Sequence, residues 1–179
     1  SLSMYLVLST SLNPNSRSRV LAQHVFTCLQ AHADDVEFHD LQGVDLPLCD
    51  GGACYGHAEA QRLIGLVERA KGVVLAAPIY NYDVGAAAKN AVEITGKAWT
   101  GKVVGFACAA GGMVSYMSVM GLANSLMLDF RSFIVPRFVY ATGKAFDEQN
   151  RLIDEQTLER ADQLAAEMVR VTRALCGDA

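Results

Sequence analysis

Short, continuous runs of apolar residues alternate along the chain with longer stretches whose apolar positions recur at helical spacing. The runs predict five β-strands, at Met4 to Ser9, Val36 to Leu41, Gly72 to Ala77, Lys102 to Ala110 and Phe133 to Ala141. The third strand is apolar throughout, as a strand covered on both faces of a sheet is. Pro136 is expected to break the last strand, because proline has no N–H to donate to a neighbouring strand.

The intervening stretches predict helices. They run from about Ser16 to His32, His57 to Lys71, Ala86 to Thr95, Met113 to Phe130 and Asp154 to Leu175. In the second helix Leu63, Leu66, Val67 and Ala70 share one face, and Asp154 is a suitable N-cap for the last helix. Strands that alternate with helices predict an α/β fold in which a parallel, doubly wound sheet forms the middle of three layers.

The composition is that of a globular protein, since 51% of the 179 residues are hydrophobic and 19% are charged. With 15 basic and 19 acidic residues, the net charge of −4 argues against a nucleic-acid-binding protein, which usually carries a basic face. No run of about 18 apolar residues is present, so no membrane span is expected. We interpret Ser1 to Ser3 as a remnant ahead of a native Met4, followed by a single domain over residues 4–179.

The cysteines favour a cytoplasmic location, because their number is odd and they are dispersed rather than arranged as a disulfide framework. They are Cys28, Cys49, Cys54, Cys108 and Cys176. Cys49, Cys54 and His57 have a spacing that zinc ligands can adopt, but no fourth ligand is nearby, and a flexible glycine-rich loop is the interpretation we favour. Cys108 is expected to be inert in a buried strand. His39 is expected to be exposed or hydrogen-bonded.

The loop after the first strand is rich in hydroxyl and amide groups and leads into a helix N-terminus. Free backbone N–H groups and the helix dipole favour an anion at such a position. The candidate phosphate-binding residues are Ser11, Asn13, Ser16, Arg17 and Ser18. The alternative is an ordinary polar turn, with Asn15 or Ser16 as the helix N-cap. The loop has neither the P-loop pattern GxxxxGK[ST] nor the pattern GxGxxG.

Two further loops are expected at the same end of the sheet, where doubly wound folds bind their ligands. After the third strand the chain reads Pro78, Ile79, Tyr80, Asn81 and Tyr82. After the fourth strand, Gly111 and Gly112 allow backbone to approach a ligand closely. Taken alone, the tyrosines could cover the sheet end or a subunit contact, and the glycines could form a tight turn. Together the three loops describe a site for a mononucleotide with a flat ring, such as flavin mononucleotide (FMN).

Two motifs resemble those of the NADPH-dependent FMN reductase family, which is flavodoxin-like and includes azoreductases, chromate reductases and quinone reductases. PIYNYDVGAAAKNAVE (Pro78 to Glu93) resembles PxYNxxxPxxLKNAID, with Gly85 where a proline is common. TSLNPNSRS (Thr10 to Ser18) resembles GSxRxxSxN, with Asn13 at the usual arginine, for which Arg17 or Arg19 can compensate. Asp45 to Asp50 (DLPLCD) is similar to the family segment DLPLYD.

This resemblance implies a five-stranded parallel sheet of order 2-1-3-4-5 and an FMN cofactor, with Pro78 to Tyr82 along the flavin. It also implies an oxidoreductase that takes electrons from NADPH or NADH and passes them to a small-molecule quinone, azo, metal or flavin acceptor. Flavin N5 would carry the chemistry, so no catalytic side chain is expected. Two alternatives are a flavodoxin-like electron carrier and a flavin-free scaffold or sensor that keeps the fold.

The helix predicted from Met113 to Phe130 is more apolar than one buried face requires. Its apolar residues are Met113, Tyr116, Met117, Met120, Leu122, Leu126, Met127 and Leu128. Core packing explains part of this surplus. We expect the remainder to form a subunit contact in a homodimer or homotetramer.

Overall fold

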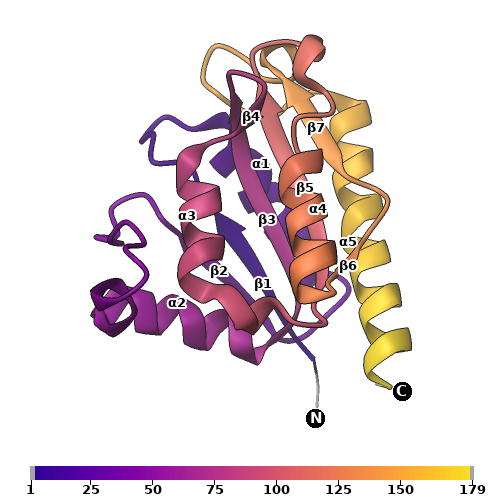
Figure 1. Ribbon diagram of the computed structural model, residues 1–179. Coiled ribbons are helices and arrows are strands. Elements are labelled where there is room, and N and C mark those ends of the chain that lie inside the picture. The colour runs from indigo at the N-terminus through magenta and orange to yellow at the C-terminus, as the bar shows by residue number, and fades with distance from the viewer. Residues whose placement is uncertain (1–2, 178–179) are drawn as a thin grey trace.

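A parallel β-sheet runs through the centre of the molecule, and helices cover both of its faces (Figure 1). The computed structural model describes residues 3–177. Its strands are β1 (Met4–Ser9), β2 (Val36–Asp40), β3 (Ala70–Tyr80), β4 (Asp83–Val84), β5 (Val103–Ala110), β6 (Phe133–Ile134) and β7 (Val139–Thr142). Of Ser1 to Ser3, the first two residues lie outside the described part of the chain, and Ser3 is half-buried just before β1.

The strand order is β2-β1-β3-β5. Both β6 and β7 pair with β5, and together they form the two halves of the last strand. All of these pairings are parallel. The predicted order of the five strands is therefore confirmed. The interruption falls at Pro136, as predicted. The short strand β4 was not predicted, and it pairs with the end of β3 as an antiparallel hairpin.

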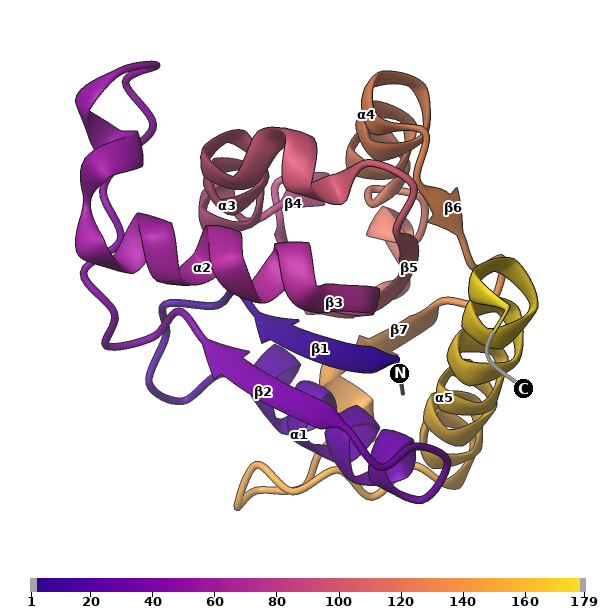
Figure 2. The same ribbon diagram turned by 90° about the horizontal axis from the view of Figure 1, so that it is seen from below.

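The helices are α1 (Arg17–Gln30), α2 (Ala58–Arg69), α3 (Ala86–Thr95), α4 (Met120–Phe130) and α5 (Glu155–Cys176), with short 3₁₀ turns η1 (Ala53–Gly56), η2 (Gly96–Trp99), η3 (Met113–Ser115) and η4 (Gly143–Ala145). Figure 2 shows α1 and α5 on one face of the sheet and α2, α3 and α4 on the other. Each face has its own apolar core, with Leu21 and Leu164 in one and Leu63, Trp99 and Phe106 in the other. The three-layer arrangement is thus confirmed.

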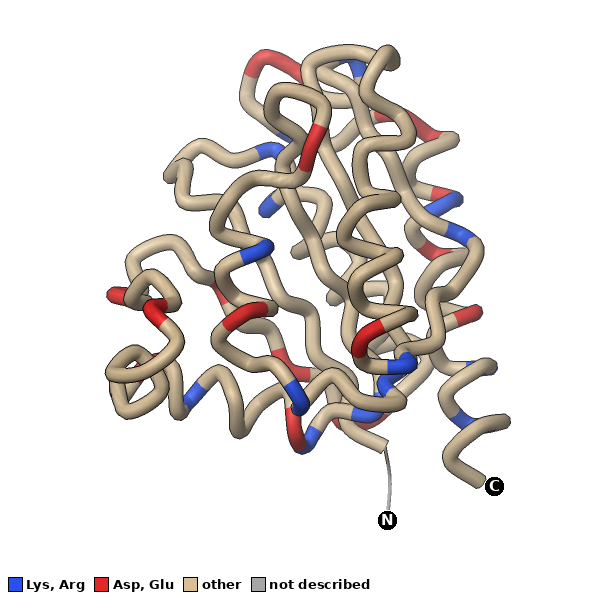
Figure 3. The backbone as a smooth tube through the Cα atoms, in the orientation of Figure 1, with Lys and Arg blue, Asp and Glu red and all other residues tan. Residues whose placement is uncertain are grey.

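Charged residues lie mainly on the helices and loops that surround the sheet (Figure 3). Strands β1 and β5 contain none, and their side chains are almost all buried. Two helix N-caps are formed by side chains that the sequence indicated. Ser16 Oγ accepts from Arg19 N at 3.0 Å, and Asp154 Oδ2 accepts from Thr157 N at 2.9 Å. Within residues 3–177, no helix is both long and apolar enough to cross a membrane.

Two expectations were wrong. The helix predicted from Met113 to Phe130 begins only at Met120, because the Tyr116 ring packs against Phe138 and Tyr140 and holds the preceding segment in turns. The ring centroids are 5.1 and 5.7 Å apart. His39 is neither exposed nor fully hydrogen-bonded. It is buried in β2, its Nε2 has no partner among the described residues, and burial lowers its pKa.

Candidate functional site

A cavity of about 410 Å³ opens at the carboxyl ends of β1, β3 and β5, a volume within the range of small-molecule sites. It is lined by Ser11, Asn13, Asn15, Ser16, Arg17, Ser18, Pro78, Ile79, Tyr80, Ala109, Ala110, Gly111 and Asn150. The three loops singled out in the sequence therefore meet at one place. Of the predicted site residues, only Asn81, Tyr82 and Gly112 are outside this lining.

The N-terminus of α1 forms one end of the cavity. Ser11, Ser16 and Ser18 are buried there. The Ser16 and Ser18 hydroxyl oxygens are 2.9 Å apart, and Ser11 Oγ accepts from Asn13 N at 3.2 Å. Because no acidic residue is present in the first turn of α1, no carboxylate there neutralises the positive end of the helix dipole. Hydroxyl groups and free backbone N–H groups thus converge where an anion would be stabilised.

The two arginines of this loop have different roles. Arg19 Nε donates to Asp40 Oδ2 at 2.5 Å, and its Nη1 donates to the carbonyl oxygens of Asn13 and Pro14 at 3.0 and 3.1 Å. Arg19 therefore holds the loop in shape. Arg17 lines the cavity, and its guanidinium carbon is 5.8 Å from the centroid of the Phe146 ring. Arg17 is thus the cation that can reach an anion.

Small departures from the family motif have structural explanations. Thr10, at the usual glycine, is buried and donates from Oγ1 to Ala76 O of β3 at 2.7 Å, which ties the loop to the sheet. Asn13, at the usual arginine, accepts from Asn15 N at 2.9 Å through its side-chain oxygen. That bond shapes the turn and leaves the amide N–H groups as donors. Asn13 adds no charge, so the positive charge on the cavity wall comes from Arg17.

The hairpin of β3 and β4 projects two tyrosines at the rim. Tyr80 and Tyr82 are 53% and 68% exposed, so neither ring covers the sheet end within this chain. The two turn residues, Asn81 and Tyr82, both have positive φ, of 51° and 65°. Their backbone follows a two-residue hairpin turn of the type that suits the twist of the strands. Both rings therefore remain available to a ligand or a partner.

Gly85 closes the hairpin, and its N–H donates to Pro78 O at 2.9 Å. A proline at this position, common in the family motif, would lose that bond because it has no N–H. Asn90, which matches the motif, instead joins α3 to the segment after β2. Its side chain accepts from Cys49 N at 2.8 Å and donates to Pro47 O at 3.0 Å.

The third wall is the turn after β5. Around Gly111 and Gly112, no atom lies within 4 Å of where a Cβ would stand, so the backbone is open to an approaching group. The Tyr140 hydroxyl donates to Gly112 O and holds the turn in place. Beneath this wall Cys108 is buried, and burial raises its pKa to about 12. Its thiol therefore stays protonated.

Four lining residues were not predicted: Asn15, Ala109, Ala110 and Asn150. Asn15 adjoins predicted positions and was considered only as a helix cap. Ala109 and Ala110 directly precede the predicted glycines, so proximity could have found them. Asn150 comes from the far end of the chain and donates from Nδ2 to Asn15 O at 3.3 Å. No local signal marks it, because its place depends on a contact across 135 positions.

The alternative zinc site is not formed. His57 acts as the N-cap of α2, where its Nδ1 accepts from Glu59 N at 3.2 Å. Among residues 3–177, no cluster of three or more His, Cys, Asp or Glu side chains is arranged to hold a metal ion.

The sheet order and the position of the cavity define a flavodoxin-like α/β protein with a ligand site at the carboxyl end of its sheet. Residues 4–147 match the family model described as NADPH-dependent FMN reductase. The chain belongs to this family. It is also 32% identical over 139 residues to an NAD(P)H-dependent FAD/FMN reductase of Geobacillus thermodenitrificans (strain NG80-2), covering 76% of this chain and 75% of the relative.

Solved structures share the fold at low sequence identity. A flavoenzyme NAD(P)H:(acceptor) oxidoreductase from Paracoccus denitrificans superposes with a TM-score of 0.78 at 20% identity, over 97% of this chain and 98% of that chain. An azoreductase from Bacillus anthracis str. Sterne gives a TM-score of 0.69 at 16% identity, over 92% and 99% of the two chains. These similarities confirm the flavodoxin-like architecture.

Proposed function

We propose that this protein is an FMN-dependent oxidoreductase that takes electrons from NADPH or NADH and passes them to a small acceptor, such as a quinone, an azo compound, a metal ion or a free flavin. The observation that carries the proposal is the convergence of an anion-binding helix N-terminus, an exposed tyrosine hairpin and an open glycine turn on one cavity. Family membership and the names of the relatives support it.

The residues present fit a phosphorylated flavin. Ser11, Ser16, Ser18 and the α1 backbone would bind the phosphate, with Arg17 supplying positive charge. These groups form one anion-binding end, which suits a mononucleotide. Pro78 to Tyr82 and the turn at Gly111 and Gly112 would lie along the ribityl chain and the ring.

A flavin held by these residues would supply two-electron redox chemistry through its N5. The lining contains no carboxylate, imidazole or thiol. The chain would therefore act by positioning: backbone donors near Asn81 would orient the ring edge, and Tyr80 and Tyr82 would limit the access of water to the ring. One cavity serving donor and acceptor in turn predicts ping-pong kinetics.

The visible spectrum of the purified protein tests this proposal. We expect a flavin spectrum, either as purified or after addition of FMN. The flavin absorbance should decrease when NADPH or NADH is added under anaerobic conditions. It should return when an acceptor such as a quinone is supplied. A protein that binds FMN but does not oxidise either nicotinamide would instead be an electron carrier. A protein that stays colourless with FMN would be a flavin-free scaffold or sensor.

A double substitution locates the flavin. Tyr80→Ala with Asn81→Ala should lower FMN affinity by about tenfold or more, because the loss of an aromatic face and a turn residue removes contacts worth more than about 1.4 kcal/mol. Tyr55→Ala is the matched control, since Tyr55 is 39% exposed and is not among the residues that line the cavity. FMN affinity that is unchanged in the double variant contradicts the assignment of the site.

A further inference from the structure

Two cysteines with adjacent sulfur atoms lie in the loop between β2 and α2, outside the cavity described above. Cys49 Sγ and Cys54 Sγ are 3.8 Å apart, and both cysteines are in the thiol form. Formation of a disulfide requires about 2.05 Å between the two sulfur atoms. The two sulfur atoms are therefore in contact but not bonded. Gly51 and Gly52, the first with φ of 73°, form the turn that brings the cysteines together.

Backbone hydrogen bonds fix both ends of this turn. Asp50 Oδ1 accepts from Gly52 N at 2.9 Å and from Cys54 N at 3.0 Å. The Cys54 N–H is the largest of the effects that lower the pKa of Asp50 to about 2, so this carboxylate stays ionised. At the other end, Cys49 N donates to the Asn90 side chain of α3 at 2.8 Å. The contact between the thiols is thus held from two sides.

The two thiols are not equivalent. Cys54 is buried, with 4% of its surface exposed, whereas Cys49 is half-buried. The Tyr55 hydroxyl lies 3.6 Å from Cys49 Sγ, where it can donate to a thiolate, and this contact is the main reason that the pKa of Cys49 is lowered. Burial raises the pKa of Cys54. Cys49 is therefore the accessible thiol that ionises first, and Cys54 is the protected thiol beside it.

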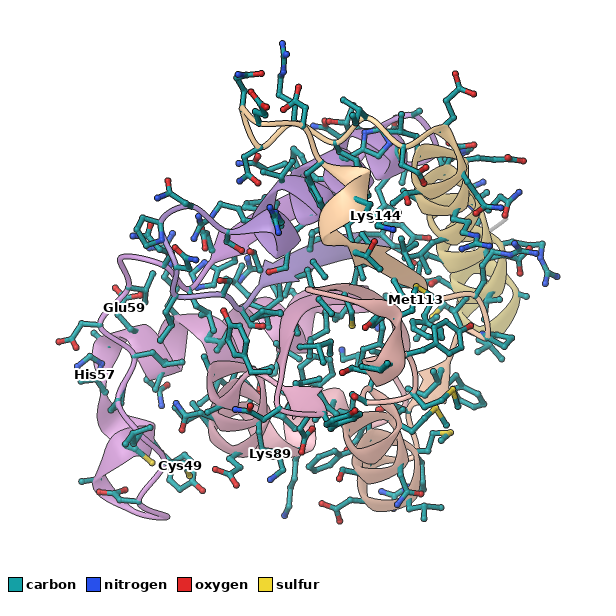
Figure 4. The ribbon with its side chains drawn as sticks, turned by 90° about the horizontal axis from the view of Figure 1, so that it is seen from above. Cys49, His57, Glu59, Lys89, Met113 and Lys144 are labelled. Atoms are coloured by element: carbon teal, nitrogen blue, oxygen red, sulfur yellow. The ribbon has the colours of Figure 1, made fainter. Side chains whose placement is uncertain are left out.

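Cys49 also opens onto a second cavity. This cavity has a volume of about 580 Å³, lies between the loop, α3 and α4, and shares no lining residue with the first one. Its walls carry the ion pair of Lys89 and Glu93, whose Nζ and Oε1 atoms are 2.8 Å apart, and the carboxylate of Asp129. Figure 4 shows Cys49 and Lys89 on one side of the molecule, apart from Met113 and Lys144. Such walls suit a small zwitterionic ligand.

We propose that Cys49 and Cys54 form a reversible dithiol–disulfide couple that exchanges with low-molecular-weight peptide disulfides entering this second cavity. The Cys49 thiolate attacks one sulfur of the ligand, so that a Cys49–ligand disulfide forms, the ligand's S–S bond breaks, and one thiolate leaves. Cys54 then attacks Cys49 Sγ and releases the second half of the ligand as a thiolate. The two protons lost by the cysteines end on the two released thiols, and two electrons pass from the protein to the ligand.

Oxidised glutathione serves as the probe for the full-length protein, in a Cys176→Ser background that removes an exposed thiol. We expect the intact mass to fall by two hydrogen atoms, with a linked peptide that contains Cys49 and Cys54, and we expect reduced glutathione to reverse the change. In the Cys54→Ser variant, one glutathione should remain attached to Cys49. In the Cys49→Ser variant, Cys54 should react with oxidised glutathione at least about tenfold more slowly than Cys49 does in the Cys54→Ser variant, because Cys54 is buried.

A pH profile separates this role from chance proximity. In the Tyr55→Phe variant, the pH midpoint of Cys49 alkylation should rise, because the hydrogen bond that lowers the pKa of the thiol is lost. Cys176 in the otherwise native chain is the control, being an exposed thiol with no neighbouring cysteine. The proposal is overturned if peptide mapping finds no link between Cys49 and Cys54, or if Cys49 of Cys54→Ser reacts no faster than Cys176. Circular dichroism confirms that each variant is folded.

Discussion

At the scale of single residues, the most informative feature is the backbone of Tyr82. Its φ of 65° lies in the left-handed region, next to Asn81 with φ of 51°. Asparagine tolerates this region, but for other residues with a side chain it costs about 1–2 kcal/mol. Glycine is the usual residue at this position of such a hairpin turn. Strain of this kind persists where function requires the side chain, and the Tyr82 ring is 68% exposed.

We therefore expect Tyr82→Gly to change stability and binding in opposite directions. Relief of the left-handed strain should raise the free energy of unfolding of the flavin-free protein by about 1 kcal/mol. Loss of the ring should weaken FMN binding several-fold. Urea unfolding and fluorescence titration with FMN measure the two effects.

The Tyr82→Phe variant is the control, because it keeps the ring and the strained backbone. It should bind FMN nearly as well as the native protein and gain no stability. If Tyr82→Gly lowers stability, the turn is not strained. If it leaves FMN affinity unchanged, the ring does not serve the flavin.

The sequence could indicate the hydroxyls at Ser11, Ser16 and Ser18, because a loop that leads into a helix N-terminus is a local pattern. It could not decide between Arg17 and Arg19. That choice depends on the ion pair between Arg19 and Asp40, two residues from different strand–helix units.

At the scale of elements, the features set by neighbouring residues were predictable. The caps at Ser16 and Asp154 and the break at Pro136 each depend on one side chain and its own turn. The late start of α4 was not predictable, because it follows from the packing of Tyr116 against residues more than twenty positions away.

The cap of α5 gives a pH-dependent prediction. The Thr157 hydroxyl and N–H lower the pKa of Asp154 from its ordinary value of 3.8, so the carboxylate favours the folded state. This contribution is complete above pH 3.8 and is lost as the pH falls through the lower pKa of the folded state. Asp154→Ala should reduce the free energy of unfolding by about 1 kcal/mol at neutral pH.

Urea unfolding at a series of pH values provides the measurement. The deficit of Asp154→Ala should shrink as the pH falls from 3.8 towards the lower pKa of the folded state, because over this range Asp154 is protonated in the unfolded state before it is protonated in the folded state. Asp154→Asn keeps an acceptor oxygen and should lose less at neutral pH. A deficit that is independent of pH in the acid range would show that the charge of the cap is unimportant.

At the scale of the whole molecule, one face remains apolar after folding. Its exposed side chains are Met113, Val114, Tyr116, Met117, Met120 and Met127, with Leu128 at its border with the second cavity. They belong to η3, to α4 and to the turns that join them, whereas Leu122 and Leu126 point into the core. Contiguous apolar patches of this kind mark contact surfaces. We propose that a second copy of this chain covers the face, as in a homodimer or a homotetramer.

Light scattering of the purified protein tests this assembly, and we expect a mass of at least twice 19.2 kDa. Met120→Glu places a charge in the contact, where its desolvation costs about 3 kcal/mol or more and weakens association by more than about a hundredfold. Ile153→Glu is the matched control, because Ile153 is 55% exposed outside this face and Met120 is 44% exposed within it. The control should keep the native mass while Met120→Glu becomes a monomer. If the native protein is a monomer at micromolar concentration, the proposed contact between two copies of this chain is wrong, and the apolar face has another occupant.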